Sequence, residues 1–171
     1  MSDAETTGHI DVGILMGSKS DLETMRPAAK MLESLGLQVE VRVLSAHRTP
    51  DETAAFVRAA VGRGVKAFIC GAGGAAHLAG AVAAHTTRPV IGVPIANGPL
   101  SGFDSLLSTV QMPPGMPVAT VAVGGAENAG LLAAQIIAVA DAELGKRVEA
   151  ERAARRKKVL DSDAEVRGAK A

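Results

Sequence analysis

Short apolar runs alternate along the chain with longer segments in which apolar residues recur every three or four positions. The runs are patterned like buried or half-buried strands, and the longer segments have the period of helices that pack on a sheet with one face. The pattern predicts five strands, at about 12–17, 38–44, 65–71, 89–95 and 117–124. A helix is expected after each strand; the third should reach about residue 87 and the last should begin near residue 128, with Leu132, Ile136 and Val139 on one face.

Several helix starts carry recognisable capping signals. Residues 20–23 (SDLE) and 49–52 (TPDE) each place a serine or threonine three positions before a glutamate, which is the pattern of a capping box. Pro50 falls at the first helical position, where proline is favoured. Pro27 lies inside the first helix and should bend it. Ser101 is the expected cap of the fourth helix.

Repeated strand–helix units predict an α/β fold, a parallel sheet with helices on both faces. Ligands of such sheets bind at the carboxyl ends of the strands, so chemistry-bearing residues are expected directly after each strand. We expect a single domain over residues 1–145. Residues 146–171 form a charged helix or tail with nine Lys or Arg and five Asp or Glu. Its "RRKK" run would suit an anionic partner, but the interleaved acidic residues favour a solvated or subunit-docking helix.

Composition narrows the classes of function. Lys plus Arg and Asp plus Glu number 18 each, and there is no Trp or Tyr, which argues against nucleic-acid binding by charge or stacking. The only cysteine, Cys70, excludes an internal disulfide and fits a reducing compartment. The start of the chain has no signal-peptide pattern, and no apolar run is long enough to span a membrane. We therefore expect a cytoplasmic protein without a membrane partner.

The loop after the first strand reads "GSKSD" (17–21). Ser18 and Ser20 offer hydroxyl groups, and the free amides of a helix start favour an anion such as phosphate. Asp21 would repel that anion, but it could accept hydrogen bonds from neighbouring sugar hydroxyls. The alternative is an ordinary capped helix in which the aspartate favours the positive end of the dipole.

The loop after the second strand reads "SAHR" and offers Ser45, His47 and Arg48. Arg48 can hold a phosphate with two hydrogen bonds. His47 is of the one residue type whose proton equilibrium ordinarily lies near neutral pH, which suits an acid–base role. A structural role for this histidine remains the alternative at this point.

The loop after the third strand reads "GAGGAAHL" (71–78), in which three glycines allow close backbone approach to a ligand. Its spacing differs from GxGxxG, so we reject a nicotinamide site. His77 either points into the pocket or fills the helix start, and the glycines could serve helix–sheet packing instead. We expect Cys70 in the core and His9 and His85 on the surface. No His or Cys pair has metal-ligand spacing, so no metal is expected.

Six motifs in order resemble one enzyme family over about residues 12–144. They are "MGSKSD", "SAHRTP", "GAGGAAHLAG", "GVPI", "LSGFDSLLSTVQMP" and "NAGLLAAQI", and they resemble the N5-carboxyaminoimidazole ribonucleotide mutases, the class I PurE-type enzymes of purine biosynthesis. The resemblance implies a flavodoxin-like three-layer fold and a homo-octamer with sites shared between subunits. It also implies that the VQMP segment (110–113) lies at an interface and that the C-terminal helix docks on a neighbour.

The implied reaction moves a carboxyl group from the exocyclic nitrogen of an imidazole ribonucleotide to ring carbon C4, without a metal, nucleotide cofactor or ATP. Matched by position, the resemblance makes His47 the proton-transfer residue. The substrate-binding residues that it implies are Ser18, Ser20, Asp21, Ser45, Arg48, Gly73, Gly74, Ala75 and His77. The related class II carboxylases use free carbon dioxide and read like "SAHKGP", so "SAHRTP" favours the mutase.

Two other interpretations remain open from the sequence. The chain could be a flavodoxin-like module that only binds a phosphorylated ligand, in which case His47 would be dispensable. It could also be a phosphosugar isomerase, which would need no imidazole substrate.

Overall fold

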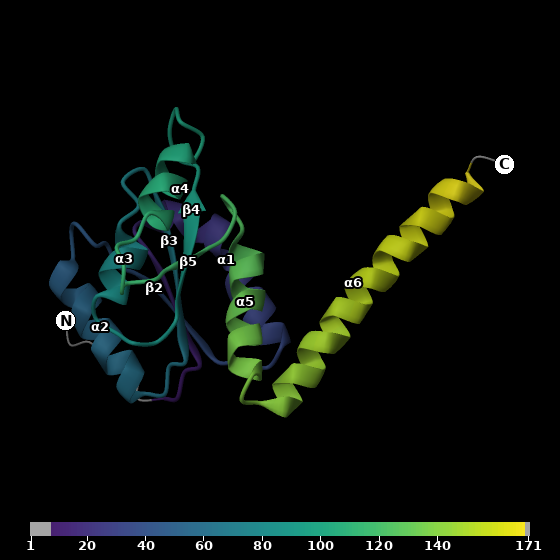
Figure 1. The fold of residues 1–171 in the computed structure, drawn as a ribbon, viewed down its shortest axis with the longest axis horizontal. Coiled ribbons are helices and arrows are strands. Elements are labelled where there is room, and N and C mark those ends of the chain that lie inside the picture. Colours follow the sequence, from purple (N-terminus) through teal and green to yellow (C-terminus); the bar gives the residue numbers. More distant parts are fainter. Residues whose placement is uncertain (1–7, 170–171) are drawn as a thin grey trace.

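The structure, a computed structural model that describes residues 8–169, confirms the predicted parallel sheet (Figure 1). The strand order is β2-β1-β3-β4-β5, and each neighbouring pair runs parallel. This is the strand order of flavodoxin-like folds. The strands are β1 (Val12–Met16), β2 (Val39–Val43), β3 (Ala67–Gly73), β4 (Val90–Ile95) and β5 (Ala119–Thr120).

Helices cover both faces of the sheet and complete the three layers. Helices α1 and α5 pack together on one face, and α2 and α3 lie on the other, with α4 beside β4 (Figure 1). The helices are α1 (Leu22–Ser34), α2 (Pro50–Gly62), α3 (Leu78–Ala83), α4 (Phe103–Val110), α5 (Ala126–Ala138) and α6 (Ala142–Gly168). A short 3-10 turn, η1 (Lys19–Asp21), precedes α1.

The central strands are buried on both sides, which explains their continuous apolar runs. Ile14 of β1 belongs to the core under α1 and α5, and its neighbour Leu15 belongs to the core under α2 and α3. Both are fully buried. The sheet therefore forms a rigid platform from which the loops at its carboxyl end project.

The edge strand β2 departs from the sequence prediction. Val39, Val41 and Val43 alternate with charged residues, which is the pattern of a strand with one buried face, but Val41 and Val43 are 39% and 52% exposed. The side chain of Glu40, in contrast, is only 12% exposed and pairs with Arg63 at 2.7 Å. A face of a strand is buried by the layer that covers it, and of these three valines Val39 is the one that packs against the core under α1 and α5.

Neither predicted capping box forms as expected. Both lie in loops at the carboxyl end of the sheet, after β1 and β2. The box expected at 20–23 lies two residues earlier, where Ser18 caps η1 and Asp21 closes the box. Thr49 is the N-cap of α2 but makes no side-chain cap bond. Its hydroxyl instead accepts a hydrogen bond from the N–H of Ser45 at 2.8 Å and thereby holds the preceding loop.

Three other boundaries differ from the prediction. Helix α3 ends at Ala83 rather than near residue 87, and β5 has two residues rather than eight. Gly102, with a φ of +87°, caps α4 in place of Ser101. Val139, which was expected on the packed face of the last helix of the domain, is 89% exposed because α5 ends just before it.

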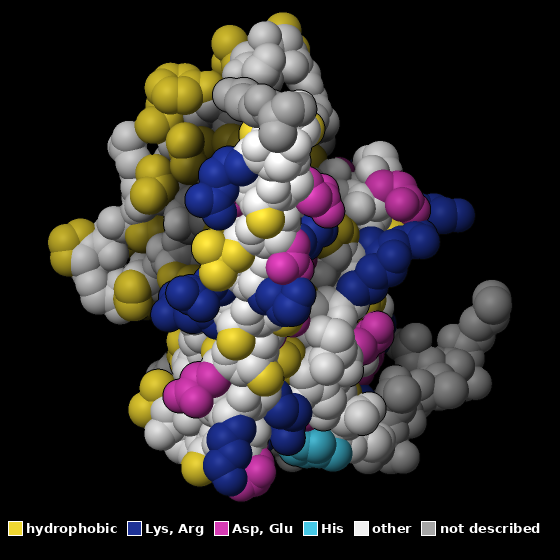
Figure 2. All heavy atoms as spheres, turned by 90° about the vertical axis from the view of Figure 1, so that its right-hand side faces the viewer, with side chains coloured by type: hydrophobic (Ala, Val, Ile, Leu, Met, Phe, Trp, Pro, Cys, Tyr) yellow, Lys and Arg dark blue, Asp and Glu magenta, His cyan; other side chains and the backbone are white. Residues whose placement is uncertain are grey.

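Helix α6 leaves the domain as one long helix (Figure 1). Of its 27 residues only Leu144 is buried, and side chains of both charges are mixed along it (Figure 2). Arg147 donates to the carbonyl of Leu35, and Arg155 bonds Glu127 at the start of α5, so its first half is tied to the domain. No helix within residues 8–169 combines the length and the apolar character needed to cross a membrane.

Gly71 of β3 leaves room for the side chain of Met25 from α1, and this gives the first prediction. A Cβ at Gly71 would overlap the side chain of Met25, which is buried. We expect Gly71→Ala to lower the free energy of unfolding by about 1–3 kcal/mol, the usual cost of overpacking. Urea denaturation measures this change.

Gly62 provides the matched control, because a Cβ there meets nothing within 4 Å. Gly62→Ala should leave stability unchanged or raise it by up to about 1 kcal/mol, since alanine is the better helix former. An equal loss in the two variants would contradict the packing explanation.

Candidate active site

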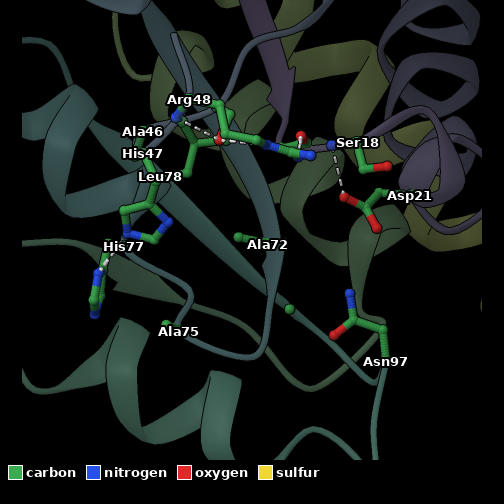
Figure 3. A pocket seen from close by; sticks show the side chains of 13 residues that line it. Ser18, Asp21, Ala46, His47, Arg48, Ala72, Ala75, His77, Leu78 and Asn97 are labelled. Atoms are coloured by element: carbon green, nitrogen blue, oxygen red, sulfur yellow. Dashed lines mark hydrogen bonds between the residues drawn. The ribbon is translucent and has the colours of Figure 1, made fainter. Parts of the chain in front are cut away.

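A cavity of about 250 Å³ opens at the carboxyl end of the sheet (Figure 3). Strands β2 and β3 flank β1, so the connections diverge there and the cavity lies at the topological switch point, where ligands bind in such folds. Loops that follow β1, β2, β3 and β4 contribute to its wall. The lining residues are Gly17, Ser18, Asp21, Ser45, Ala46, His47, Arg48, Ala72, Gly73, Ala75, His77, Leu78 and Asn97.

The loop after β1 is held by hydrogen bonds among its own side chains. Asp21 accepts from the N–H of Ser18 at 3.1 Å, and the hydroxyl of Ser20 donates to that of Ser18 at 2.9 Å. These bonds form the capped turn η1 and fix the directions of the hydroxyl groups. The loop therefore presents Ser18 and Asp21 to the cavity in a fixed geometry.

Asp21 is a buried carboxyl at the wall of the cavity, with only 4% of its surface exposed. Burial raises the pKa of this carboxyl above its ordinary value of 3.8, although the N–H of Ser18, the hydroxyl of Ser20 and the charge of Arg48 act in the opposite direction. Keeping such a group ionised costs folding free energy. That cost is typical of a residue retained for function rather than for stability.

The loop after β2 is anchored at Ser45. Thr49 accepts from the N–H of Ser45 and donates to its carbonyl at 3.1 Å, which closes the loop before α2. Arg48 then reaches across the cavity and donates to the carbonyl of Gly17 at 2.6 Å. Its guanidinium thus lies against the β1 loop, next to Ser18 (Figure 3). The two loops together form a cationic site suited to a phosphate.

His47 meets His77 at the opposite side of the cavity from Asp21 (Figure 3). Nε2 of His47 lies 2.9 Å from Nδ1 of His77, which is a hydrogen-bond distance. The rings meet edge to face, with centroids 5.0 Å apart and planes at 87°. A residue after β2 and a residue at the start of α3 thereby form one acid–base pair within the site.

The loop after β3 passes close beneath the cavity. Gly74 has a φ of +61°, and Ser108 of α4 accepts from the N–H of Ala76 at 3.0 Å and donates to the carbonyl of Gly74 at 3.2 Å. A Cβ at Gly73 would overlap the side chain of Asn97. The glycines therefore leave room for Asn97 and for a ligand beside the backbone.

Eight of the ten residues that the sequence pointed to line this cavity. Ser20 and Gly74 do not, and they shape the wall through its hydrogen bonds and backbone turn instead. Asn97 was missed, although it comes two residues after β4 and the rule that ligand-binding residues follow strands could have identified it. Its side chain makes no hydrogen bond with another residue in the described part of the chain.

Two further groups bear on the chemistry. Cys70 is buried, and burial raises the pKa of its thiol, so it is a poor nucleophile. Within residues 8–169 no three His, Cys, Asp or Glu side chains are grouped so as to hold a metal ion. The ionisable side chains that line the cavity are therefore one histidine pair, one carboxyl group and one guanidinium.

Comparison with known proteins identifies the family. A family model described as AIR carboxylase matches residues 11–158. The chain belongs to the AIR carboxylase family. The matched range contains the whole sheet and every residue that lines the cavity, so the resemblance drawn from the six motifs is confirmed.

Two relatives with more than half of their residues identical share one name. N5-carboxyaminoimidazole ribonucleotide mutases from Vibrio cholerae and Bacillus subtilis are 54% and 53% identical over 153 residues, covering 88% of this chain and 95% and 94% of theirs. Among solved structures, PurE from Treponema denticola aligns with a TM-score of 0.81 and 29% identity over 90% of this chain and 96% of its own.

The buried carboxyl of Asp21 gives a prediction that combines stability and pH. Because the folded-state pKa is raised, the fold binds this proton more tightly than the unfolded chain, and stability falls as pH rises from about 3.8 through the raised pKa. Asp21→Asn removes the titration and retains an oxygen for the N–H of Ser18. We expect the variant to unfold at a higher temperature than the wild type at pH 7. This difference in unfolding temperature should disappear as pH falls below about 4.

Asp51→Asn is the control for this comparison. Asp51 is exposed in the first turn of α2, where its loss should cost roughly 0.5 kcal/mol through the helix dipole. Thermal unfolding between about pH 4 and pH 8 distinguishes the two variants. If the difference in unfolding temperature between Asp21→Asn and the wild type stays constant over this range, the raised pKa is contradicted.

Proposed function

We propose that the chain is an N5-carboxyaminoimidazole ribonucleotide mutase of purine biosynthesis. One observation carries the proposal: Arg48, Asp21 and His47 line one cavity at the switch point of the sheet. These residues supply a guanidinium that binds an anion, a carboxylate that accepts from sugar hydroxyls and an imidazole that can give and take a proton. A ribonucleotide with a reactive ring requires these groups. The name that its relatives carry supports the same substrate.

The substrate is oriented by the charges of the cavity. Arg48, the hydroxyl of Ser18 and the N–H of Lys19 bind the phosphate, since the N–H groups of Ser18 and Ser20 already serve the cap. The carboxylate of Asp21 accepts hydrogen bonds from the ribose hydroxyls. This placement directs the imidazole ring toward His47, opposite the phosphate. Such positioning of the reacting groups supplies a large part of the rate in reactions of this kind.

The reaction proceeds by loss and recapture of the carboxyl group. The bond between the exocyclic nitrogen and the carboxyl carbon breaks, carbon dioxide leaves, and His47 donates a proton to the nitrogen. Ring carbon C4 then attacks the trapped carbon dioxide, and neutral His47 removes the C4 proton, which restores the aromatic ring. One proton moves from C4 to nitrogen, so His47 ends in its starting state.

Trapped carbon dioxide requires a closed, water-poor pocket. The glycine loop and Ala72, Ala75 and Leu78 provide small or apolar walls. Small, close-fitting surroundings of this kind exclude competing water. Gly73 and Asn97 line the remaining wall of the cavity and are free to contact the imidazole nucleotide.

We also propose that the chain acts as a homo-octamer in the cytoplasm, with sites shared between subunits. The support is an apolar face on α4 and its flanks, next to the loops of the cavity, with Phe103 63% exposed and Leu100 59% exposed. Figure 2 shows apolar side chains gathered at this end of the molecule. Exposed apolar surfaces of this kind mark association sites. The long, mostly exposed α6 offers a second surface for a neighbouring copy.

Activity measurements on two substrates test the function. We expect wild-type enzyme to convert N5-carboxyaminoimidazole ribonucleotide at a rate that does not depend on added bicarbonate. His47→Asn should lower kcat by about 100- to 10,000-fold, the usual contribution of a general acid–base. The imidazole absorbance follows the reaction. Exposed His85 supplies the control, because His85→Asn removes a ring outside the cavity and should leave the rate unchanged.

Other outcomes would assign a different function. Turnover of aminoimidazole ribonucleotide only when bicarbonate is present would make the chain a carboxylase. Full activity in His47→Asn would contradict the role of this residue. Thermal protection by simple sugar phosphates equal to that by the imidazole nucleotide would favour the phosphosugar isomerase or the binding module.

The size of the assembly is a separate prediction. Light scattering should give the mass of eight 17.3 kDa chains for the wild type. Phe103→Asp places a charge on the apolar face and should shift the mass toward smaller species while circular dichroism stays unchanged, since the side chain is exposed. A fully active monomer would contradict shared sites.

A further inference from the structure

His47 and His77 form a contact that constrains where protons lie in the site. The 2.9 Å distance between Nε2 of His47 and Nδ1 of His77 is that of a hydrogen bond, so one nitrogen carries a proton and the other does not. The rings come from loops 30 residues apart, and both line the cavity. In Figure 3 the second nitrogen of His47, Nδ1, lies on the side of the ring toward Ala72 and the cavity.

We infer that Nδ1 of His77 accepts a hydrogen bond from the Nε2–H of His47 and thereby fixes Nδ1 of His47 as the nitrogen that exchanges protons with the substrate. The inference rests on the proposed function for its catalytic meaning. His77 is then a positioning residue that acts through His47 rather than a group that binds substrate. The tautomer of a histidine is commonly set in this way by the partner of its second nitrogen.

The two possible directions of this hydrogen bond differ in what they allow. When His47 donates from Nε2, its ring can gain or lose a proton at Nδ1 while the bond to His77 remains. When His77 donates instead, Nε2 of His47 must carry no proton. A His47 that acts as an acid, with protons on both nitrogens, would then lose the hydrogen bond to His77. Only the first direction permits His47 to be an acid and then a base without movement of either ring.

Proton transfer in the proposed reaction balances under this assignment. Nδ1–H of His47 delivers its proton to the exocyclic nitrogen as the bond from nitrogen to the carboxyl carbon breaks. After C4 forms its bond to carbon dioxide, the lone pair on the same Nδ1 takes the C4 proton. Nε2–H donates to His77 in both stages, so His77 neither gains nor loses a proton.

Within residues 8–169, the hydrogen bond between the two histidines is the one that either ring makes. Arg48 and Asp21 are the charged residues that line the cavity, and the hydrogen bonds of Arg48 go to Ser45 and Gly17. Asp21 accepts from Ser18 and Ser20 at the far wall. Among the described residues, His77 is therefore the side chain that determines the tautomer of His47.

Two variants at His77 test the inference kinetically. His77→Leu removes the acceptor, and we expect kcat to fall about tenfold with little change in KM, the factor that one ordinary hydrogen bond supplies. His77→Asn retains an oxygen near the position of Nδ1 and should restore most of the rate. His77 is exposed, so both variants are expected to fold, and His85→Leu controls for loss of an exposed imidazole.

A tautomer measurement tests the inference without turnover. Nitrogen-15 NMR of imidazole-labelled protein above about pH 8, where ordinary imidazoles are neutral, distinguishes Nε2–H from Nδ1–H. The chain has four histidines, and His47→Asn assigns the His47 signals by their absence. We expect the Nε2–H form of His47 in the wild type and in His77→Asn, and a mixture of tautomers in His77→Leu.

The outcomes separate this inference from the proposed function. The Nδ1–H form of His47 in the wild type, or equal kcat for His77→Leu and wild type, would overturn the inference. The same loss of rate in His77→Asn as in His77→Leu would also overturn it. If the wild type does not turn over the imidazole nucleotide but shows the expected tautomers, the histidine pair stands and the proposed function fails.

Discussion

The divergence of the chain at β1 is the constraint on which the site depends. Strands β2 and β3 pair with β1 on opposite sides, so the loops after all three strands emerge side by side at one edge of the sheet. The first loop supplies a carboxyl group, the second a guanidinium and an imidazole, and the third a glycine-rich backbone and a second imidazole. The buried strands β1 and β3 hold their loops in place because their side chains are packed on both faces.

Hydrogen bonds within and between the loops then convert this proximity into a defined geometry. Thr49 fixes Ser45, Arg48 spans to Gly17, and Ser108 of α4 fixes the glycine loop from below. The site also lowers the stability of the fold, because Asp21 is buried with a raised pKa. A buried carboxyl group of this kind, which costs stability, is common in active sites.

The sequence was sufficient to predict the architecture and most of the residues that line the cavity. The predictions failed where local signals compete with tertiary contacts. Continuous apolar runs predicted the central strands, and the rule that ligand-binding residues follow strands placed His47 and Arg48 at the same edge as Ser18 and Asp21. Thr49, expected to cap α2, binds the backbone of Ser45 instead, and the cap expected from Ser20 is made by Ser18. The contact between His47 and His77 depends on how far two loops approach each other in space, which no spacing along the chain encodes. Asn97 lies in the cavity because Gly73 has no Cβ, and this fit is visible only when both backbones are placed.

An isotope measurement tests whether the carboxyl group moves from nitrogen to C4 within one cavity. Substrate carrying carbon-13 in its carboxyl group is converted in the presence of excess unlabelled bicarbonate, and the product is analysed by mass spectrometry. We expect the label to be retained in the carboxyl group on C4 in nearly every product molecule. Replacement of the label by carbon from bicarbonate would contradict this expectation, because the carbon dioxide would then leave the cavity before the new bond forms.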